Sequence, residues 1–158
     1  MKLLALIILA LVSAFAPPAN AQDKWRIADE AMVRLKPVVF RQLPKHIVSY
    51  LERRNCAVPQ IFGESEPHNV IRGQFARSGQ IDWAVLCSRN RVSAILIFWN
   101  GSTKSVAEIA PDDDKSFLQT ISGDGKIGFS RAIGVVDKDY ILEHYHEYNG
   151  TKPPPIKH

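Results

Sequence analysis

The N-terminal segment sets the limits of what this chain can fold into. Residues 1 to 21 carry a lysine at the second position, an apolar run from Leu3 to Ala16 with one serine, two prolines, and a small-residue ending, Ala19-Asn20-Ala21. This order is typical of a cleavable secretory signal peptide. The apolar run of 14 residues is shorter than the roughly 20 residues that a membrane-spanning helix needs, which disfavours a retained anchor. We therefore expect an exported chain, periplasmic or secreted, that begins at Gln22.

The length that remains after cleavage indicates one domain. Removing 21 residues from 158 leaves 137, which is enough to bury a hydrophobic core. We expect a single α+β domain over residues 22–152 and a proline-rich, extended tail over residues 153–158. Because no later apolar run approaches spanning length, we expect no membrane span after signal cleavage.

The charge is modest overall but unevenly distributed. Without the lysine of the leader, 19 basic residues face 16 acidic ones, for a net charge of +3. Residues 22–54 hold 8 basic and 4 acidic residues, whereas residues 101–158 hold 7 basic and 9 acidic ones. A basic N-terminal third suits an anionic envelope polymer, although the helical spacing of its cations is better explained by a solvated helix face. Nucleic-acid binding is not expected, because Trp25 and Tyr50 are better placed as core anchors than as stacking platforms.

The two cysteines, Cys56 and Cys87, are expected to form a disulfide. An even pair far apart in sequence usually closes a bridge in an oxidising compartment. The enclosed loop of 30 residues corresponds to roughly 3 to 4 kcal/mol in the chain-entropy model. The bond would join the end of a helix to the middle of a sheet. The alternative, a catalytic thiol with a histidine partner, needs one cysteine to be free.

Two helices are predicted before the first strand. An apolar stripe that includes Trp25 and Leu35 predicts an amphipathic helix over residues 24–35, which Pro37 ends. A second helix is predicted from Pro44 to Arg54, with cations in its last turn. Asn55 ends this helix, and residues 56–59 are expected to be extended because they lead into a proline.

An antiparallel meander is predicted from residue 70 onward. Strands are expected over residues 70–76, 81–88 and 92–99, and a fourth near residues 105–109 after the turn Asn100-Gly101. The continuously apolar stretch 94–99 indicates a central strand that is covered on both faces. A fifth strand is expected over residues 131–136.

The C-terminal third contains turn and cap signals. The run Asp112-Asp113-Asp114 predicts a cap for a short helix through Phe117 and Ile121, and residues 123–126 predict a tight turn. Residues Asp137 to Tyr148 predict a helix with Asp137 as its cap and Gly150 just past its end, with a strand as the alternative. The resulting fold class is α+β, with N-terminal helices on an antiparallel meander of four to five strands and a C-terminal helix.

No motif for catalysis or cofactor binding stands out in the sequence. Of the five histidines, His144 and His146 are the weak candidates for a metal site, because they would share a face only if their segment were a strand. The three consecutive aspartates lack the spacing of a calcium loop, and the glycines of residues 123–128 lack the pattern of a phosphate loop. Neither Ser102 nor Ser130 lies in a nucleophile elbow. We expect no cofactor, and we assign no catalytic residue.

One segment resembles a known repeat. The pattern Gly73-x-Phe75-x-x-x-Gly79-x-x-Asp82-x-Ala84-Val85 resembles the strand-turn-strand of FG-GAP and VCBS blades, which are extracellular interaction repeats. The acidic calcium-loop positions of those blades are occupied here by Gln74, Ala76, Arg77 and Ser78. The resemblance therefore implies a hairpin without calcium binding.

A longer resemblance covers much of the mature chain. The segments Leu43-Pro44, Arg54-Asn55-Cys56-Ala57-Val58-Pro59-Gln60 and Asp82-Trp83-Ala84-Val85-Leu86-Cys87-Ser88 resemble a group of uncharacterised exported bacterial proteins. The resemblance implies export and a cysteine pair, and it implies that such chains continue past the proline run.

The sequence favours a noncatalytic interaction module that binds an unknown protein or envelope polymer. A cell-envelope hydrolase or hydrolase inhibitor is the first alternative, and a metal-binding protein that uses His144 and His146 is the second. The binding residues are not predicted.

Overall fold

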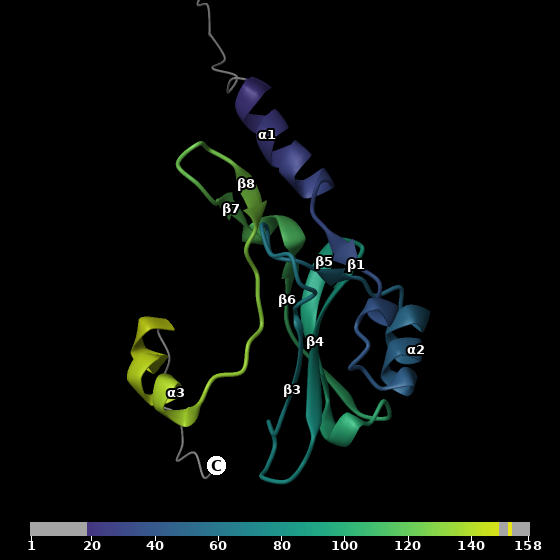
Figure 1. The fold of residues 1–158 in the computed structure, drawn as a ribbon. Coiled ribbons are helices and arrows are strands. Elements are labelled where there is room, and N and C mark those ends of the chain that lie inside the picture. The colour runs from purple at the N-terminus through teal and green to yellow at the C-terminus, as the bar shows by residue number, and fades with distance from the viewer. Residues whose placement is uncertain (1–18, 149–151, 153–158) are drawn as a thin grey trace, which may run out of the picture.

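A four-stranded antiparallel sheet forms the centre of the molecule (Figure 1). The computed structural model describes residues 19–148 and Lys152. The sheet has the order β3-β4-β5-β6, and its strands span Val70–Gly73, Asp82–Arg89, Val92–Phe98 and Val106–Asp113. Each strand pairs with its sequence neighbour, which confirms the predicted meander and the α+β class. The most fully buried strand is β4, not the apolar stretch of β5, because β4 is covered on both faces.

One face of the sheet packs against helix α2, Lys45–Arg53. Ile47 and Leu51 lie four residues apart on one side of this helix, and both are fully buried. The core that they enter is apolar and includes Phe40, Leu43, Val58, Trp83, Val85, Leu96 and Phe98. The ring of Tyr50 meets that of Phe98 edge-on, with 5.4 Å between centroids. The predicted helix over this segment is confirmed.

The end of α2 is fixed by a left-handed residue. Asn55 has φ 53°, and its N–H donates to the carbonyl of Glu52 at 2.9 Å. The N–H of Cys56 donates to the carbonyl of Leu51 at 3.0 Å. These two bonds form a Schellman motif, in which asparagine stands at the position that usually holds glycine. The chain then turns directly into strand β2, Val58–Pro59, as the proline predicts.

The other face of the sheet is covered by a hairpin and helix α1. Strands β7, Leu118–Thr120, and β8, Ile127–Phe129, pair antiparallel, and α1, Ala19–Glu30, lies against β8 (Figure 1). Leu86 of β4 joins Leu118 and Phe129 in this second core. Strand β1, Arg34–Leu35, pairs with β2 and connects α1 to the rest of the domain.

The predicted helix over residues 24–35 is wrong at both ends. Helix α1 already includes Ala19 and ends at Glu30, and residues 34–35 are a strand. The strand is favoured because its backbone pairs with β2, and because the N–H of Gln60 donates to the carbonyl of Val33 at 2.9 Å. Most of the expected signal peptide lies outside the described residues, as does the tail 153–158.

Two predictions in the C-terminal third are also wrong. The expected helix through Ile121 is a single 3-10 turn, η3, Asp114–Phe117, after which the chain enters β7. Asp113 caps that turn, accepting from the N–H of Lys115 at 3.0 Å. The strand expected over residues 131–136 is absent from the described residues, because side chains bind this segment instead of a neighbouring strand. The amide of Asn69 donates to the carbonyl of Arg131 at 3.2 Å and accepts from the N–H of Ile133 at 3.0 Å.

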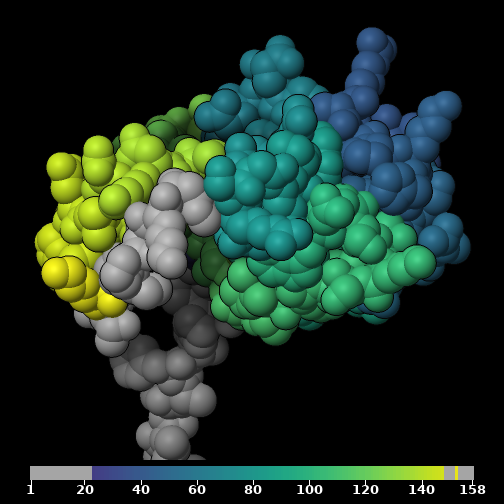
Figure 2. Space-filling view, turned by 90° about the horizontal axis from the view of Figure 1, so that it is seen from below, coloured from purple at the N-terminus to yellow at the C-terminus, as the bar shows by residue number. Residues whose placement is uncertain are grey.

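The C-terminal helix is present, and the strand alternative is wrong. Helix α3 spans Lys138–His144 and continues into a 3-10 turn, η4, Tyr145–Tyr148. Asp137 caps it, accepting from the N–H of Tyr140 at 2.8 Å. The expected Gly150 lies outside the described residues. Figure 2 shows α3 and α2 on opposite sides of the molecule. Among the described helices, none combines the length and apolarity needed to cross a bilayer.

Candidate functional site

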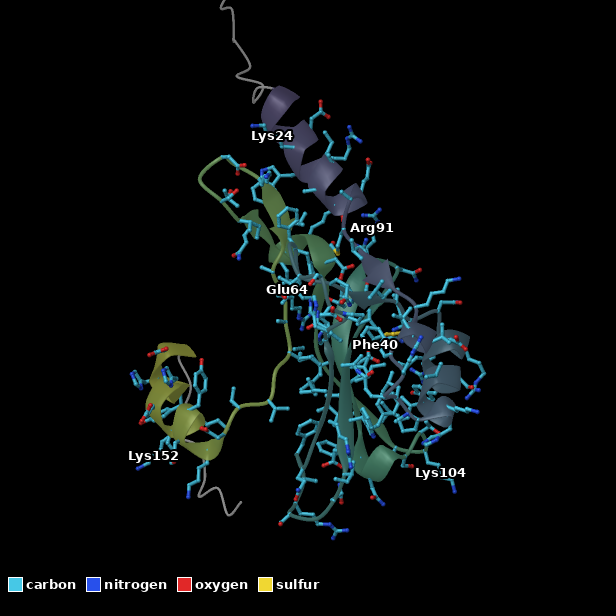
Figure 3. All side chains as sticks on the ribbon, viewed as in Figure 1. Lys24, Phe40, Glu64, Arg91, Lys104 and Lys152 are labelled. Carbon is cyan, nitrogen blue, oxygen red and sulfur yellow. A yellow bond between two sulfur atoms is a disulfide. The ribbon has the colours of Figure 1, made fainter. Side chains whose placement is uncertain are left out.

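The two cysteines are joined, as predicted. Cys56 follows the end of α2 and Cys87 lies within β4, with 5.5 Å between their Cα atoms. Figure 3 shows the bridge as a yellow bond near Phe40, between the sheet and α2. Neither sulfur is free to act as a nucleophile, so the disulfide is structural.

The two candidate metal ligands are not brought together into a site. His144 stacks on the ring of Tyr140 at 4.2 Å, whereas His146 meets the ring of Tyr145 edge-on at 5.6 Å. Two residues that are two apart on a helix point to different sides. Within residues 19–148 and Lys152, no three histidine, cysteine or acidic side chains gather in a way that would hold a metal ion.

The candidate serines also lack a catalytic partner in the described residues. The hydroxyl of Ser130 donates to the carbonyl of Phe117 at 2.8 Å, and that of Ser102 accepts from the N–H of Lys104 at 3.2 Å. The Nε2 of His46 lies 2.8 Å from the backbone carbonyl of Gly101. None of the hydrogen bonds in this part of the chain joins a histidine to a serine hydroxyl.

The three consecutive aspartates have three different environments. Asp112 accepts from the hydroxyl of Ser116 at 3.1 Å at the surface, and Asp113 caps η3. Asp114 is fully buried, a role that sequence reasoning missed. Its Oδ2 accepts from the guanidinium of Arg34 at 2.8 Å and from the hydroxyl of Ser88 at 2.6 Å.

Asp114 belongs to a group of four charged residues and one serine that we call the ionic cluster, which comprises Asp29, Arg34, Ser88, Arg91 and Asp114. Asp29, also buried, pairs with Arg91 at 2.5 Å and lies 3.8 Å from the guanidinium of Arg34. The cluster joins α1, β1, β4, the β4–β5 turn and η3. Arg34 and Asp114 are 80 positions apart, so no local pattern predicts their contact. A buried carboxylate needs such partners because removal of its hydration is costly.

Asp82, which belongs to the FG-GAP-like pattern, is a structural centre. Its buried carboxylate accepts four hydrogen bonds at 2.6 to 3.0 Å, from the backbone of Phe75, Ala76 and Asn100 and from the side chain of Gln80. Burial alone would raise the pKa of Asp82, but these hydrogen bonds stabilise the charged form and bring the net pKa below its ordinary value. The residue therefore ties the β3–β4 loop to the turn after β5.

The candidate binding site is an apolar groove between α1, the loop of residues 60–67 and β8. Its volume is about 330 Å³, within the range of small ligand sites. Its walls are mostly hydrophobic and include Ala28, Ala31, Met32, Ile61, Phe62, Ile127 and Phe129. Phe62 is 46% exposed, so a large apolar side chain stands open beside the groove. We refer to this feature as the apolar groove.

The loop wall of the groove is held by two side chains. Gln60 closes the loop, since its Oε1 accepts from the N–H of His68 at 2.9 Å while its Nε2 donates to the carbonyls of Val58 and Pro59 at 2.9 and 3.1 Å. The Nε2 of His68 accepts from the N–H of Ile61 at 2.6 Å. The proton of a neutral His68 therefore resides on Nδ1, 3.0 Å from the carbonyl of Glu66.

The strand wall depends on a glycine. The N–H of Phe62 donates to the carbonyl of Phe129 at 2.9 Å, which places the loop directly over β8. A Cβ atom on Gly128 would overlap the Cβ and Cγ atoms of Phe62. Only glycine permits this approach, so the shape of the groove depends on Gly128.

The groove has opposite charges at its two ends. Glu64 and Glu66 line one end, are exposed, and have no ion-pair partner among the described residues. At the other end an adjoining hollow is lined by Lys24, Lys126 and Asp124, and Lys126 pairs with Asp124 at 3.3 Å, which leaves a net positive charge. Figure 3 shows Lys24 near the start of α1 and Glu64 below the β7–β8 hairpin.

No family model, curated protein or solved structure matches this chain.

Proposed function

We propose that this chain is an exported, noncatalytic interaction module that binds a short segment of a partner protein in the apolar groove. The observation that carries the proposal is the groove itself, which combines apolar walls, a fixed loop and, at one end, two carboxylates that form no ion pair in the described part of the chain. The class of module follows from the sequence, and the groove supplies a place for the partner.

Contacts within the chain hold the walls of the groove in place. Gln60 and His68 fix the loop, and Gly128 fixes its distance from β8. A site that does not have to order itself on binding loses less conformational entropy. The groove is therefore suited to a small, specific contact.

The chemistry of the groove indicates what the partner segment contains. An apolar wall favours a leucine or phenylalanine side chain, whose burial removes hydrophobic surface from water. Glu64 and Glu66 favour a lysine or arginine beside it, since complementary charges give specificity. We infer a partner segment with one large apolar residue that is flanked by basic ones.

Export is part of the proposal. The leader predicts it, and a disulfide is typical of an oxidising compartment. The first residue that lines the groove is Ala28, so cleavage before Gln22 leaves every groove residue in the mature chain. Mass spectrometry of the exported protein is expected to show a chain that starts at Gln22, and an intact leader would contradict export by this route.

The binding test uses two sets of synthetic hexapeptides, one with leucine or phenylalanine between lysines and one with the same residues between glutamates. We expect the mature chain to bind the lysine set and not the glutamate set in fluorescence polarisation. Ala31→Trp should block the groove and abolish binding. Val135→Trp is the matched control, because Val135 is 62% exposed and does not line the groove.

Variants of the glutamates separate specific recognition of the lysine peptides from their nonspecific attraction to an acidic surface. Glu64→Gln with Glu66→Gln should weaken binding of the lysine set by about tenfold, whereas Glu143→Gln on α3 should leave it unchanged. If Glu143→Gln weakened peptide binding as much as Glu64→Gln with Glu66→Gln, the proposal would be contradicted. Mass spectrometry of the incubated peptides tests the hydrolase alternative, which cleaved products would favour.

A further inference from the structure

A second surface feature lies at the C-terminal end of α2, where the helix meets the β4–β5 turn. This hollow has a volume of about 350 Å³ and is lined by Arg54, Asn55, Arg89, Asn90 and Val92. We call it the polar hollow. Its lining includes two arginines and two asparagines, and no acidic residue among the described ones. It shares no residue with the apolar groove, so a ligand of the polar hollow is independent of the proposed function.

The backbone presents the two asparagines by the same means. Asn55 has φ 53° at the end of α2, and Asn90 has φ 52° in the turn between β4 and β5. Arg91 follows Asn90 with φ 64°, so this is a two-residue hairpin turn with both residues left-handed. Both segments are therefore tight turns of defined conformation, and the side chains that they carry start from fixed backbone positions.

The disulfide holds the two turns side by side. Cys56 directly follows Asn55, and Cys87 lies two residues before Arg89. The backbone of Ala57 and Ser88 adds two hydrogen bonds, at 3.0 and 2.8 Å, between the same two segments. The covalent bond and this short bridge keep the polar hollow assembled.

Each guanidinium in the hollow is supported on one side. Arg54 lies over the ring of Tyr50, 4.7 Å from its centroid, and has no carboxylate partner among the described residues. Arg89 forms an ion pair with Glu108 through Nη2, which leaves its Nη1 group without a carboxylate. Two positive charges therefore meet one negative charge.

The donors of the hollow fit an oxyanion. A guanidinium presents a planar fork of N–H groups that matches the oxygens of a phosphate group, and the asparagine amides add neutral donors. A cation would be repelled by the arginines. We propose that the polar hollow binds a phosphate group, either as free phosphate or as the headgroup of an anionic lipid.

The first test uses inorganic phosphate and the oxidised mature chain. Amide spectra recorded during titration at constant ionic strength should show saturable shifts at Asn55 and Asn90. Arg54→Gln with Arg89→Gln should weaken binding by about tenfold or more, because each arginine supplies charge-assisted hydrogen bonds. Arg41→Gln is the control: it removes an exposed cation from the same third of the chain that does not line the hollow.

Thermal unfolding of the double variant is the control for its structure. A cooperative transition like that of the wild type would show that a loss of phosphate binding is not caused by unfolding. The inference is overturned if phosphate causes no saturable shift, or if Arg41→Gln weakens binding as much as the double variant does. Sedimentation with lipid vesicles distinguishes free phosphate from a lipid headgroup as the ligand. Retention on phosphatidylglycerol but not phosphatidylcholine vesicles, lost in the double variant, assigns a headgroup, and phosphate binding without such retention assigns free phosphate.

Discussion

The two faces of the central sheet are covered by different means. The face toward α2 is covered by a continuous apolar core and carries the disulfide between the helix end and β4. The opposite face is covered by the β7–β8 hairpin, and α1 is held next to it through the ionic cluster, whose two carboxylates are buried. The first face is built for stability. The second leaves room for the apolar groove, and its arrangement depends on a few polar contacts between distant residues.

The largest expected effect is the loss of a carboxylate from the ionic cluster. Asp114→Ala leaves the partly buried Arg34 and the buried Ser88 without this acceptor and should lower the free energy of unfolding by about 3 to 5 kcal/mol. Urea denaturation measures the loss. Asp112→Ala, two residues earlier at the surface, should cost less than about 0.5 kcal/mol. Equal effects would show that the second face does not depend on its charges.

Removal of the disulfide tests the other face. Replacing Cys56 and Cys87 by serine should lower the free energy of unfolding by roughly 3 to 4 kcal/mol, because the unfolded chain regains the entropy of an open loop. Urea denaturation measures the loss. The free energy lost in the double variant should equal the free energy that the wild type loses when reductant is added. If reduction leaves the stability of the wild type unchanged, the covalent contribution to this face is refuted.

Asp82 should make the free energy of unfolding decrease as the pH falls. Its pKa is lowered by folding, so its contribution is complete near neutral pH and is lost as the pH falls through the range in which carboxylates protonate. Asp82→Asn should cost about 1.5 to 3 kcal/mol at neutral pH. The gap between wild type and variant should narrow in acid, as measured by urea denaturation across the pH range. A gap that does not change with pH would contradict the role of the charge.

The end of α2 offers the smallest effect. Asn55→Gly should leave stability nearly unchanged, because glycine adopts a left-handed conformation freely, whereas Asn55→Ala should cost about 1 kcal/mol. Thermal unfolding compares the two variants. If alanine is tolerated as well as glycine, the left-handed conformation is not a constraint on the first face.

The same contrast explains how much of the molecule could be predicted from sequence. Helix α2, the meander and the disulfide follow from local patterns, such as the spacing of Ile47 and Leu51 and the even cysteine count. Strand β1 has only two residues, too few for an alternating pattern to be recognised. Its pairing with β2 is nonlocal, so the sequence predicted a longer helix that includes residues 34–35 instead.

The candidate site was not predictable for a similar reason. The apolar groove is formed by α1, a loop and β8, which are far apart in sequence. Gly128 and Phe62 meet across 66 positions, and glycine alone does not indicate which side chain approaches it. The strand expected at residues 131–136 does not form because the side chain of Asn69 binds the backbone of Arg131 and Ile133, a contact across more than 60 positions that strand propensity does not describe.

The most direct test of the proposed function is a map of where a peptide binds. Amide spectra of the mature chain should be recorded with a lysine-flanked leucine hexapeptide. Binding in the apolar groove predicts saturable shifts centred on Ala28, Phe62 and Gly128, which disappear in Ala31→Trp and persist in Val135→Trp. Shifts centred on α3 or on β6, or shifts that persist in Ala31→Trp, would contradict binding in the apolar groove.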